Sequence, residues 1–409
     1  MAKILILIGG HLCTAPRPQK EAETLASAGH DVTVRGFWFK PEFVERDRQI
    51  VATKQWRFEP ILDFQPVHRW RNLNTRLHRR FARTTFKQFG IFSPVLLGYG
   101  AYAMLRAARQ MQADLTIVHS EAGLWVGNQL LKAGFRVGVD FEDWFSEDLL
   151  PGERAVRPIA KMKDFERHLL NHSAYCITTS HALADALSKV YQAPLPTVIY
   201  NTFPWSERQQ IDRQIKDRHD LSLPSLHWFS QTIGPGRGLE TLFQALPLLN
   251  QPVEVHLRGD CLPIHRQWLE SVIPKDWSHR IFIHPTVPNH ELLSRIAEHD
   301  IGLALENSDI PSRNLTITNK LFQYLQAGLA VVATDTAGQR EVFSKFPKIG
   351  RLSTDKDPIA LAAALNDLLS HAEILTIAKA AALKAASTAL CWEQQSNSLL
   401  AITHSALTK

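Results

Sequence analysis

Residues 316–343, TITNKLFQYLQAGLAVVATDTAGQREVF, contain the pattern that decides the fold. Thr318 and Asn319 are residue types that commonly open helices, and Gly328 is the type that commonly closes them. The apolar run that follows Gly328, LAVVATD, is typical of a buried strand. We therefore expect a helix that leads directly into a strand.

Lys320 is an unusual residue for the first turn of that helix. The positive end of the helix dipole lies there, and it favours Asp or Glu over a cation. An anion bound beside Lys320 would make the lysine favourable. A solvated lysine on a frayed helical turn is the alternative.

The rest of the chain alternates in the same way between strand-like runs and helical stretches. The first half contains KILILIGG, DVTVRGFW, DLTIVHS, RVGVDFED and AYCITTS, and the second half contains LHWFSQTIG, VEVHLRGD, HRIFIHPTV and IGLALE. Strands that alternate with helices of this length imply parallel strands joined by right-handed crossovers. The predicted fold class is therefore α/β, with two Rossmann-like doubly wound domains.

Polar residues and prolines separate the two halves of the chain. Residues 205–222 are the best linker candidate for this reason. We predict an N-terminal domain at residues 1–204 and a C-terminal domain at residues 223–384. Residues 385–409 contain CWEQQSNSLLAITHSAL, which predicts one amphipathic terminal helix.

The composition is that of an ordinary globular protein, with 45% hydrophobic and 21% charged residues in a chain of 409. The four cysteines are too far apart for their spacing to predict a metal site or a redox pair, and they indicate a reducing compartment. They are Cys13, Cys176, Cys261 and Cys391. The opening run MAKILILIGG is too short to span a membrane, and we expect no other window to be long and apolar enough. The predicted location is the cytoplasm, either free or peripheral at the inner face of a membrane.

The positive charge of the chain, +6 net, is concentrated in residues 68–89. This stretch holds seven Lys or Arg and no Asp or Glu. Apolar residues recur near helical spacing within it, at Trp70, Leu73, Leu77 and Phe81. One apolar face among basic residues is typical of a helix at an anionic membrane surface. The alternative is a surface helix whose apolar stripe packs on its own domain, and nucleic acid is not expected because no reader motif accompanies the patch.

Two strand-to-helix turns of the C-terminal domain are suited to an anion. The first, SQTIGPGRGLETL, places Gly234, Gly236 and Gly238 around Arg237. Its glycines let backbone N–H groups approach a ligand, and the arginine adds a positive charge. The second is the loop ENSDIPSRNLTITNK, residues 306–320, with its hydroxyls, amides and terminal lysine. A cation at each of two helix starts is best explained by a shared anionic ligand such as a diphosphate.

The order of these motifs resembles glycosyltransferases of the GT-B fold, in particular the large retaining family 4. The stretches HRIFIHPTVPNHELLSRIAEHDIGLALE and TNKLFQYLQAGLAVVATDTAGQREV are similar to the donor domain of that family. PRPQKEAETLASAGHDVTV, VDFEDWFSE and TTSHALADAL are similar to its acceptor domain. The likeness covers nearly the whole chain. It implies two domains that face each other across a cleft, with residues 385–409 packing back toward the first.

The resemblance implies transfer of a sugar from a nucleotide-diphosphate sugar to an acceptor hydroxyl, with retention. Arg237 and Lys320 would stabilise the departing diphosphate in place of a metal. No cofactor is then expected beyond the nucleotide sugar as co-substrate, and the acceptor would be a saccharide, either lipid-linked or a small molecule. The donor site implied by the resemblance consists of Gly234, Gly236, Gly238, Glu306, Thr318, Asn319, Gln323 and Glu341.

The chain departs from the family at both of two glutamates that usually stand seven residues apart. The second, which holds the nucleotide ribose in the family, is Gln323, whose amide can hydrogen-bond a hydroxyl but carries no charge. The first falls on Leu315, which cannot hydrogen-bond a sugar hydroxyl. Glu306, Asp309 or a backbone N–H must then take that role.

On the acceptor side, Glu142 stands where the family has His, and Asp143 stands where it has Glu. Gly10 and His11 close the first strand at its carboxyl end, which would face the cleft, and a simple tight turn is the alternative. His119 ends another strand on the same side. Its alternative is a structural histidine with satisfied hydrogen bonds.

Other functions remain open on the sequence. Leu315 and Gln323 allow a non-catalytic homologue that binds a nucleotide sugar or a partner protein. A nucleotide-sugar epimerase shares the fold but needs carboxylates and histidines for elimination, and no residue pattern singles these out. A dinucleotide oxidoreductase is disfavoured because GGHLCTAP, after the first strand, does not fit Gly-x-Gly-x-x-Gly. A glycosyltransferase is therefore the first hypothesis.

Overall fold

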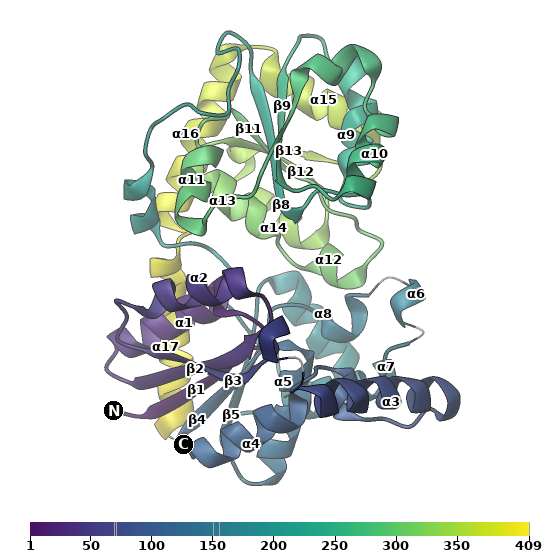
Figure 1. Ribbon diagram of the computed structural model, residues 1–409. Helices are drawn as coiled ribbons and strands as arrows, with labels where there is room; N and C mark the ends of the chain where they lie inside the picture. The colour runs from purple at the N-terminus through teal and green to yellow at the C-terminus, as the bar shows by residue number, and fades with distance from the viewer. Residues whose placement is uncertain (69, 71, 150, 155, 409) are drawn as a thin grey trace. The chain divides into compact units, whose positions relative to one another are not determined.

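The computed structural model describes residues 1–68, 70, 72–149, 151–154 and 156–408. The chain forms two compact units (Figure 1). Unit 1 consists of Met1–Ile199 and Ser396–Lys409, and unit 2 consists of Tyr200–Gln395. Each unit contains a parallel sheet with flanking helices, so the predicted α/β class is confirmed.

The sheet of unit 1 has seven parallel strands in the order β3-β2-β1-β4-β5-β6-β7. These strands are β1 (Lys3–Leu7), β2 (Asp31–Trp38), β3 (Arg57–Asp63), β4 (Leu115–Val118), β5 (Val137–Phe141), β6 (Tyr175–Thr178) and β7 (Thr197–Val198). The helices are α1 (Pro16–Ser27), α2 (Pro41–Val51), α3 (Leu73–Phe89), α4 (Ala101–Met111), α5 (Ser120–Lys132), α6 (Pro151–Arg154), α7 (Ile159–His172) and α8 (His181–Tyr191). Strands β4 and β5 are buried throughout, as expected for parallel strands that helices cover on both faces.

The sheet of unit 2 has six parallel strands in the order β10-β9-β8-β11-β12-β13. These strands are β8 (Ser225–Thr232), β9 (Glu254–Asp260), β10 (Ile281–His284), β11 (Ile301–Ala304), β12 (Ala330–Thr334) and β13 (Gly350–Ser353). The helices are α9 (Leu239–Ala245), α10 (Pro263–Val272), α11 (Asn289–Ile296), α12 (Pro311–Leu315), α13 (Asn319–Ala327), α14 (Ala337–Lys345), α15 (Pro358–Leu369) and α16 (Ala372–Thr388). Helix α17 (Trp392–Thr408) begins in unit 2 and continues into unit 1.

Helix α13 and strand β12 confirm the helix and strand predicted from residues 316–343. Thr318 is the N-cap with extended backbone, and Gly328 ends the helix at φ +86°, a left-handed conformation that favours glycine. The helix packs closely on the sheet, because a Cβ on Gly302 would lie 2.1 Å from Cγ of Tyr324. The hydroxyl of Tyr324 then donates to the backbone carbonyl of His227 at 3.0 Å. This packing fixes the start of α13 relative to β8 and β11.

In both sheets the strand order reverses at a pair of central strands, so that successive strands are added first on one side of the sheet and then on the other. Unit 1 grows from β1 to β3 on one side and continues with β4 on the other, and unit 2 does the same between β8 and β11. In open α/β sheets, ligands bind outside the carboxyl ends of the strands that flank such a reversal. The segments after β1, β4, β8 and β11 therefore form the candidate sites.

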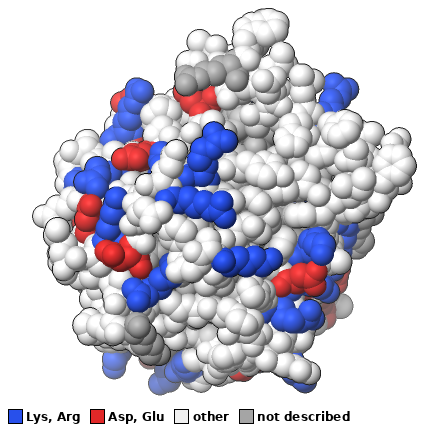
Figure 2. Space-filling view, turned by 90° about the horizontal axis from the view of Figure 1, so that it is seen from below, with Lys and Arg blue, Asp and Glu red and all other residues white. Residues whose placement is uncertain are grey.

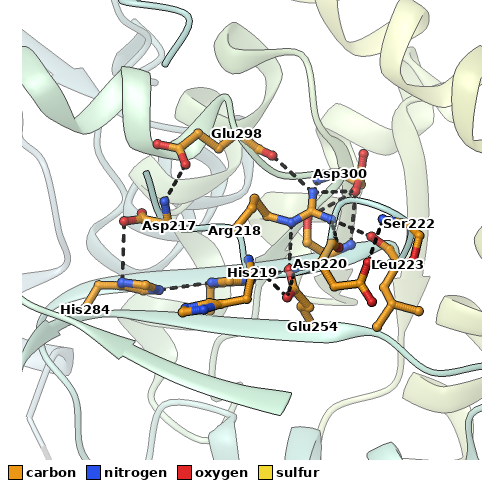
Figure 3. Close-up of polar contacts among 12 residues, drawn as sticks. Asp217, Arg218, His219, Asp220, Ser222, Leu223, Glu254, His284, Glu298 and Asp300 are labelled. Carbon is orange, nitrogen blue, oxygen red and sulfur yellow. Dashed lines mark hydrogen bonds and ion pairs between the residues drawn. The ribbon is translucent and has the colours of Figure 1, made fainter. Parts of the chain in front are cut away.

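Residues 205–222, predicted as a linker, lie with unit 2. Figure 3 shows how the end of this segment is held there. The guanidinium of Arg218 lies 2.8 Å from Glu254, in β9, and 3.3 Å from Asp300, which precedes β11. Both contacts bind the segment to strands that lie far along the chain. The predicted boundary of the C-terminal domain at residue 223 therefore differs from that of the compact unit, which begins at Tyr200.

Helices α16 and α17 correct one expectation from the sequence. Residues 372–408 are long and apolar enough to cross a membrane by length and composition alone. An 18-residue window within them has a mean hydropathy of 1.4. The core helix of a soluble protein can pass the same test. Here residues 389–391 interrupt the helix, and α16 packs on α13 and β12. Its buried face consists of Ala378, Ala382, Ala385 and Ala386. Only 33% of the apolar window is buried, so α16 packs on unit 2 by one face.

Candidate functional site

Two turns of unit 2 meet at the carboxyl ends of β8 and β11. Gly238, at φ +80°, caps the start of α9 after the glycine-rich turn, and Leu305 follows β11. A Cβ on Gly238 would lie 2.6 Å from Cβ of Leu305, much closer than a van der Waals contact. Glycine therefore lets the turn after β8 close on the turn after β11.

Lys320 is paired within unit 2. Its Nζ lies 2.6 Å from Oε1 of Glu306, the residue that follows Leu305. Lys320 is only 8% exposed, so it is not a solvated lysine on a frayed turn. Its ammonium also lies 5.7 Å from the centre of the Trp228 ring. These contacts place a carboxylate of the same chain beside the lysine, and the expectation that a ligand anion also binds there stays a prediction.

Glu306 is held in its ionised form by this pair. Burial alone would raise the pKa of Glu306, but the charge of Lys320 and hydrogen bonds from Lys320 and Thr318 lower it below the usual value. The two oxygens of an ionised carboxylate together offer about four acceptor positions. Glu306 can therefore accept a hydrogen bond from a hydroxyl while it stays paired with Lys320.

The glycine-rich turn after β8 leaves Arg237 exposed. Its guanidinium donates to Oγ of Ser230 at 3.1 Å, which uses one of its five N–H donors. The turn itself is shaped by two contacts. The N–H of Gly236 donates to Oε1 of Glu240 at 2.7 Å, and a Cβ on Gly234 would lie 2.9 Å from the ring of His265. The turn therefore presents one cation at the edge where β8 and β11 end.

The other predicted donor residues lie on α13 and α14. The side chain of Asn319 accepts a hydrogen bond from Asn201 at 2.8 Å. Gln323 is half-buried and lies four residues after Asn319, on the same face of α13. Glu341 is half-buried on α14. The pKa of Tyr200 is raised by the burial of Tyr200 itself, by the charge of Glu341 and by a hydrogen bond between the two side chains. Glu341 therefore helps to hold α14 in place through its contact with Tyr200.

Unit 1 contains a buried network of charged side chains beside the end of β4. His119 Nε2 lies 3.0 Å from Glu21, on α1, and His119 Nδ1 lies 2.6 Å from Glu142, which follows β5. Arg17 of α1 pairs with Asp140 in β5 and lies 3.6 Å from Glu21. Four of these residues are fully or almost fully buried, and the side chain of Glu142 is 31% exposed. Glu142 is therefore the end of the network that faces solvent.

The network shifts the pKa of His119 and of Glu21, and burial raises that of Glu21 to about 7. Burial alone would lower the pKa of His119, but the charge of Glu21 and the hydrogen bonds to Glu142 and Glu21 raise it well above the usual value. Burial likewise opposes ionisation of Asp140, and the charge of Arg17 outweighs it and lowers the pKa of that carboxyl. His119 thus presents an imidazolium to Glu142 and orients its carboxylate.

His11 belongs to a separate buried network. Its Nε2 accepts the backbone N–H groups of Phe39 at 2.7 Å and Lys40 at 3.0 Å, so the ring proton is on Nδ1, which lies 2.9 Å from Asp47. Both ring nitrogens are therefore used within the protein. Cys13 completes a group whose ligand atoms lie within 4.8 Å of one another. The protonated Nδ1 does not suit a metal, and burial raises the pKa of Cys13 to about 12, which keeps the thiol protonated.

Gly10 lies at the end of β1, where its carbonyl accepts the N–H of Phe37 at 2.9 Å. Asp143 is half-buried directly after Glu142. The turns that follow β1 and β4 lie against each other, as the turns that follow β8 and β11 do in unit 2. A Cβ on Gly9 would lie 2.9 Å from Cβ of Ser120, whose own φ is +70°.

A pocket of about 250 Å³ opens at these strand ends of unit 1. Its side-chain lining includes Phe37, Phe39, Tyr99, Ser120, Glu121 and Phe145. Aromatic rings with a few polar groups suit a ligand that has both apolar and hydroxyl-bearing faces. A second pocket, of about 360 Å³, lies in unit 2 beside Ala327, at the opposite end of α13 from Lys320. None of the described residues that line this second pocket belongs to the predicted site.

Residues 225–371 match a family model described as glycosyl transferases group 1. This part of the chain is similar to the domain of that family. It contains both turns of unit 2, the glycine-rich turn with Arg237 and the pair formed by Lys320 and Glu306. The comparison with curated protein sequences gave no match.

Solved structures of glycosyltransferases share the whole fold. HepE from Anabaena in complex with UDP has 16% identity and a TM-score of 0.68, and the match covers 98% of this chain and 100% of HepE. Sucrose-phosphate synthase from Thermosynechococcus elongatus has 14% identity and a TM-score of 0.71, with 100% of each chain covered. A UDP-forming trehalose-phosphate synthase from Burkholderia xenovorans has 13% identity and a TM-score of 0.69, again over 100% of each chain. These likenesses show that the chain has the GT-B fold.

Apart from Glu142, the charged residues that surround His119 were not predicted from the sequence. Arg17 and Glu21 stand four residues apart on α1, a spacing that could have suggested an ion pair but not complete burial. Asp140 stands within a strand and gave no signal of its own. The aromatic pocket was missed because its rings come from segments far apart in the sequence.

Proposed function

We propose that the chain transfers a sugar from a nucleoside diphosphate sugar to an acceptor hydroxyl, with retention and without a metal. The observation that carries this proposal is the meeting of two turns at the carboxyl ends of β8 and β11. Gly238 against Leu305 closes the turns on each other, so that Arg237 and Lys320 serve the same edge of the sheet. Helix starts at that edge, with cations beside them, suit a diphosphate.

Arg237 and Lys320 bind the diphosphate at different stages of the reaction. Arg237 is exposed and is the group that meets the incoming phosphates. Lys320 is shared between Glu306 and the diphosphate that departs, and the N–H groups at the start of α13 add positive charge beside it. Negative charge grows on the leaving diphosphate in the transition state, so these groups lower the barrier by binding it more strongly there. Their two positive charges take the place of a metal.

Glu306 takes the role that Leu315 cannot. Leu315 ends α12 and is half-buried, and its side chain has no group that could hydrogen-bond a hydroxyl. Glu306, held ionised by Lys320, accepts from a hydroxyl of the transferred sugar. Gln323, on the same helix as Lys320, offers an amide oxygen and an amide N–H to the two hydroxyls of the ribose.

The acceptor side of the proposal rests on Glu142. His119 orients the Glu142 carboxylate from the buried side, and the exposed part of that carboxylate accepts from the acceptor hydroxyl. The aromatic pocket after β1 and β4 takes the rest of the acceptor. Attack from the face that the diphosphate leaves retains the configuration at the anomeric carbon. A saccharide with an apolar portion, free or lipid-linked, fits this lining.

Thermal unfolding with a panel of nucleoside diphosphates tests the proposal. A ligand that binds only the folded state raises the melting temperature by mass action, so at least one diphosphate must raise it and the matching nucleoside must raise it less. A panel without any shift overturns the donor site. Turnover with the active donor must then survive a chelator, and the product must keep the donor's anomeric configuration by NMR. Loss of activity that magnesium restores would contradict the metal-independent mechanism.

A further inference from the structure

Helix α3 packs on unit 1 by one face only (Figure 1). Its inner face contains Ala82, which is buried against Val95 and Leu96, with Phe86 partly buried beside it. Ala82 and Phe86 are four residues apart and so lie on one stripe of the helix. Arg79 contacts Tyr99 from the same side, and the opposite side of α3 is turned away from the unit.

The outward face of α3 carries large apolar side chains. Leu73, Leu77 and Phe81 follow one another at intervals of four residues and form a continuous stripe. Their exposed fractions are 40%, 53% and 68%, and Trp70 just before the helix is 72% exposed. This rules out the alternative from the sequence, in which these residues pack on their own domain. Single exposed apolar residues are ordinary, but an aligned row of them marks an interaction site.

A second stripe of α3 is basic. Arg76, Arg80, Arg83 and Lys87 recur at intervals of three or four residues next to the apolar row, and all four are exposed. The sequence contains no Asp or Glu from residue 64 to residue 113, so no acidic neighbour along the chain offsets them. Figure 2 shows one face of the molecule, on which Lys and Arg are spread more widely than Asp and Glu. Two of the seven Lys and Arg in residues 68–89, Arg69 and Arg71, lie outside the described residues.

We propose that the α3 surface, formed by Trp70, the apolar stripe and the basic stripe, docks on an anionic lipid bilayer. Adjacent apolar and basic stripes along one helix fit a helix that lies in the plane of the interface, with its apolar side chains among the acyl chains and its cations at the headgroups. Trp is favoured at that depth because its ring is apolar and its N–H is polar. A bilayer is the occupant whose charge and flat shape complement both stripes at once.

The α3 surface is physically connected to the aromatic pocket of unit 1. Arg79, on the inner side of α3, lies 3.8 Å from the centre of the Tyr99 ring, and Tyr99 lines the pocket. Tyr99 also contacts Phe64, whose ring stacks on Phe39 of the same pocket at 5.3 Å. Docking therefore brings the pocket close to the headgroups. An acceptor that is itself anchored in the bilayer would reach the pocket without leaving the membrane.

Vesicle sedimentation tests this proposal with the full chain. We expect binding to vesicles of phosphatidylcholine and phosphatidylglycerol, no binding to pure phosphatidylcholine, and loss of binding at high salt. Each basic side chain near an anionic surface contributes roughly a fivefold factor, so the triple variant Arg80→Gln, Arg83→Gln and Lys87→Gln lowers partitioning on the order of a hundredfold. The variant Leu77→Ser with Phe81→Ser removes apolar burial and lowers partitioning on its own. The matched control is Arg266→Gln, Lys348→Gln and Lys384→Gln, three exposed cations of unit 2, which leaves partitioning unchanged.

Three results would overturn the proposal. These are no binding to anionic vesicles at low salt, equal binding to neutral vesicles, and binding that both α3 variants retain. Binding to polyglutamate without binding to vesicles assigns the α3 surface to an acidic protein instead, and self-association that the Leu77→Ser and Phe81→Ser variant abolishes assigns it to a second copy. Binding of nucleoside diphosphate is measured on every variant. Because α3 lies in unit 1 and the donor turns lie in unit 2, retained nucleotide binding shows that the variant is folded and that the donor site stands independently of the lipid result.

Discussion

Lys320 Nζ and Glu306 Oε1 lie 2.6 Å apart and join the start of α13 to the turn after β11. Both side chains are largely buried, so removing one partner leaves the other as an uncompensated charge. Donor binding at Lys320, as proposed, is therefore coupled to local stability. Substitutions at either position have to be compared with the double variant.

Lys320→Ala weakens binding of a nucleoside diphosphate roughly tenfold to a hundredfold, because a charge-assisted contact to phosphate contributes about 1.5 to 3 kcal/mol. Binding of the bare nucleoside stays nearly the same, since no phosphate is involved. Titration calorimetry with both ligands measures the difference. The double variant Lys320→Ala with Glu306→Gln restores stability but not diphosphate affinity. Equal losses for the two ligands would mean that the substitution damages the fold instead.

Arg237→Ala produces the same selective loss of diphosphate affinity without a loss of stability. Arg237 is exposed and its guanidinium hydrogen-bonds Ser230 on the surface, so the folded unit depends little on it. Arg237→Lys keeps a charge and recovers part of the affinity. Arg340→Ala, which removes another exposed arginine of unit 2, is the control and has no effect on nucleotide binding. Unchanged diphosphate affinity in Arg237→Ala would remove the glycine-rich turn from the donor site.

Gln323→Glu retains or improves donor affinity. The substitution supplies the charged ribose partner that the sequence lacks, and hydrogen bonds to a charged acceptor are stronger than those to an amide. Titration with the nucleotide sugar compares it with Gln267→Glu, an exposed control on α10. A folded variant that no longer binds donor would show that the site is built around the amide N–H of Gln323.

His119→Gln changes how the stability of unit 1 depends on pH. The pKa of His119 is raised in the folded state, so its contribution is complete below the unfolded value near 6.5 and is lost as pH rises through the folded pKa. The melting temperature of the native chain therefore exceeds that of the variant most clearly near pH 6, and the gap narrows as the pH rises through the folded pKa of His119. His172→Gln, at an exposed position in the same unit, is the control. Parallel curves would show that the folded network does not hold the proton.

Unit 2 loses stability in acid through its buried histidines. Burial lowers the pKa of His227, His284 and His299, and it lowers that of His256 to about 4. The unfolded chain takes up protons near pH 6.5, so this stability is present above that pH and is lost as pH falls toward 4.

The ring of His299 lies 4.6 Å from that of His227 and 4.5 Å from that of His256, and Phe has a similar shape. His299→Phe therefore reduces the acid-induced drop in melting temperature between pH 7 and pH 4. His290→Phe, at an exposed position, does not. An unchanged drop in His299→Phe would place the acid sensitivity elsewhere.

The sequence predicted the fold because local signals agree with it at every level. Thr318 and Gly328 bound a helix that the structure has between them, and the apolar run after Gly328 is buried strand β12. The positions of Lys320 and Arg237 at helix starts could be predicted for the same reason. The partner of Lys320 could not, because Glu306 stands fourteen residues earlier on another element and only the packing of α13 on β11 brings the two together.

The buried network around His119 in unit 1 could not be predicted from the sequence, for a related reason. Arg17 and Glu21 stand on a helix that reads as exposed, and nothing local shows that α1 buries them against His119 and Asp140. The opposite holds for α3, where periodicity alone could not say which way the apolar stripe faces. Burial is a property of the whole unit, and it decides both cases.

Gly238 and Gly9 have a consequence for anyone who screens random variants of this protein. Each lets one strand-to-helix turn close on its neighbour, Leu305 in one unit and Ser120 in the other, and any side chain at these glycines pushes the turns apart. Such variants would abolish activity without removing a single group that touches a substrate. A selection experiment would therefore rank these two glycines among the essential positions, and a map of intolerance alone would mistake them for catalytic residues.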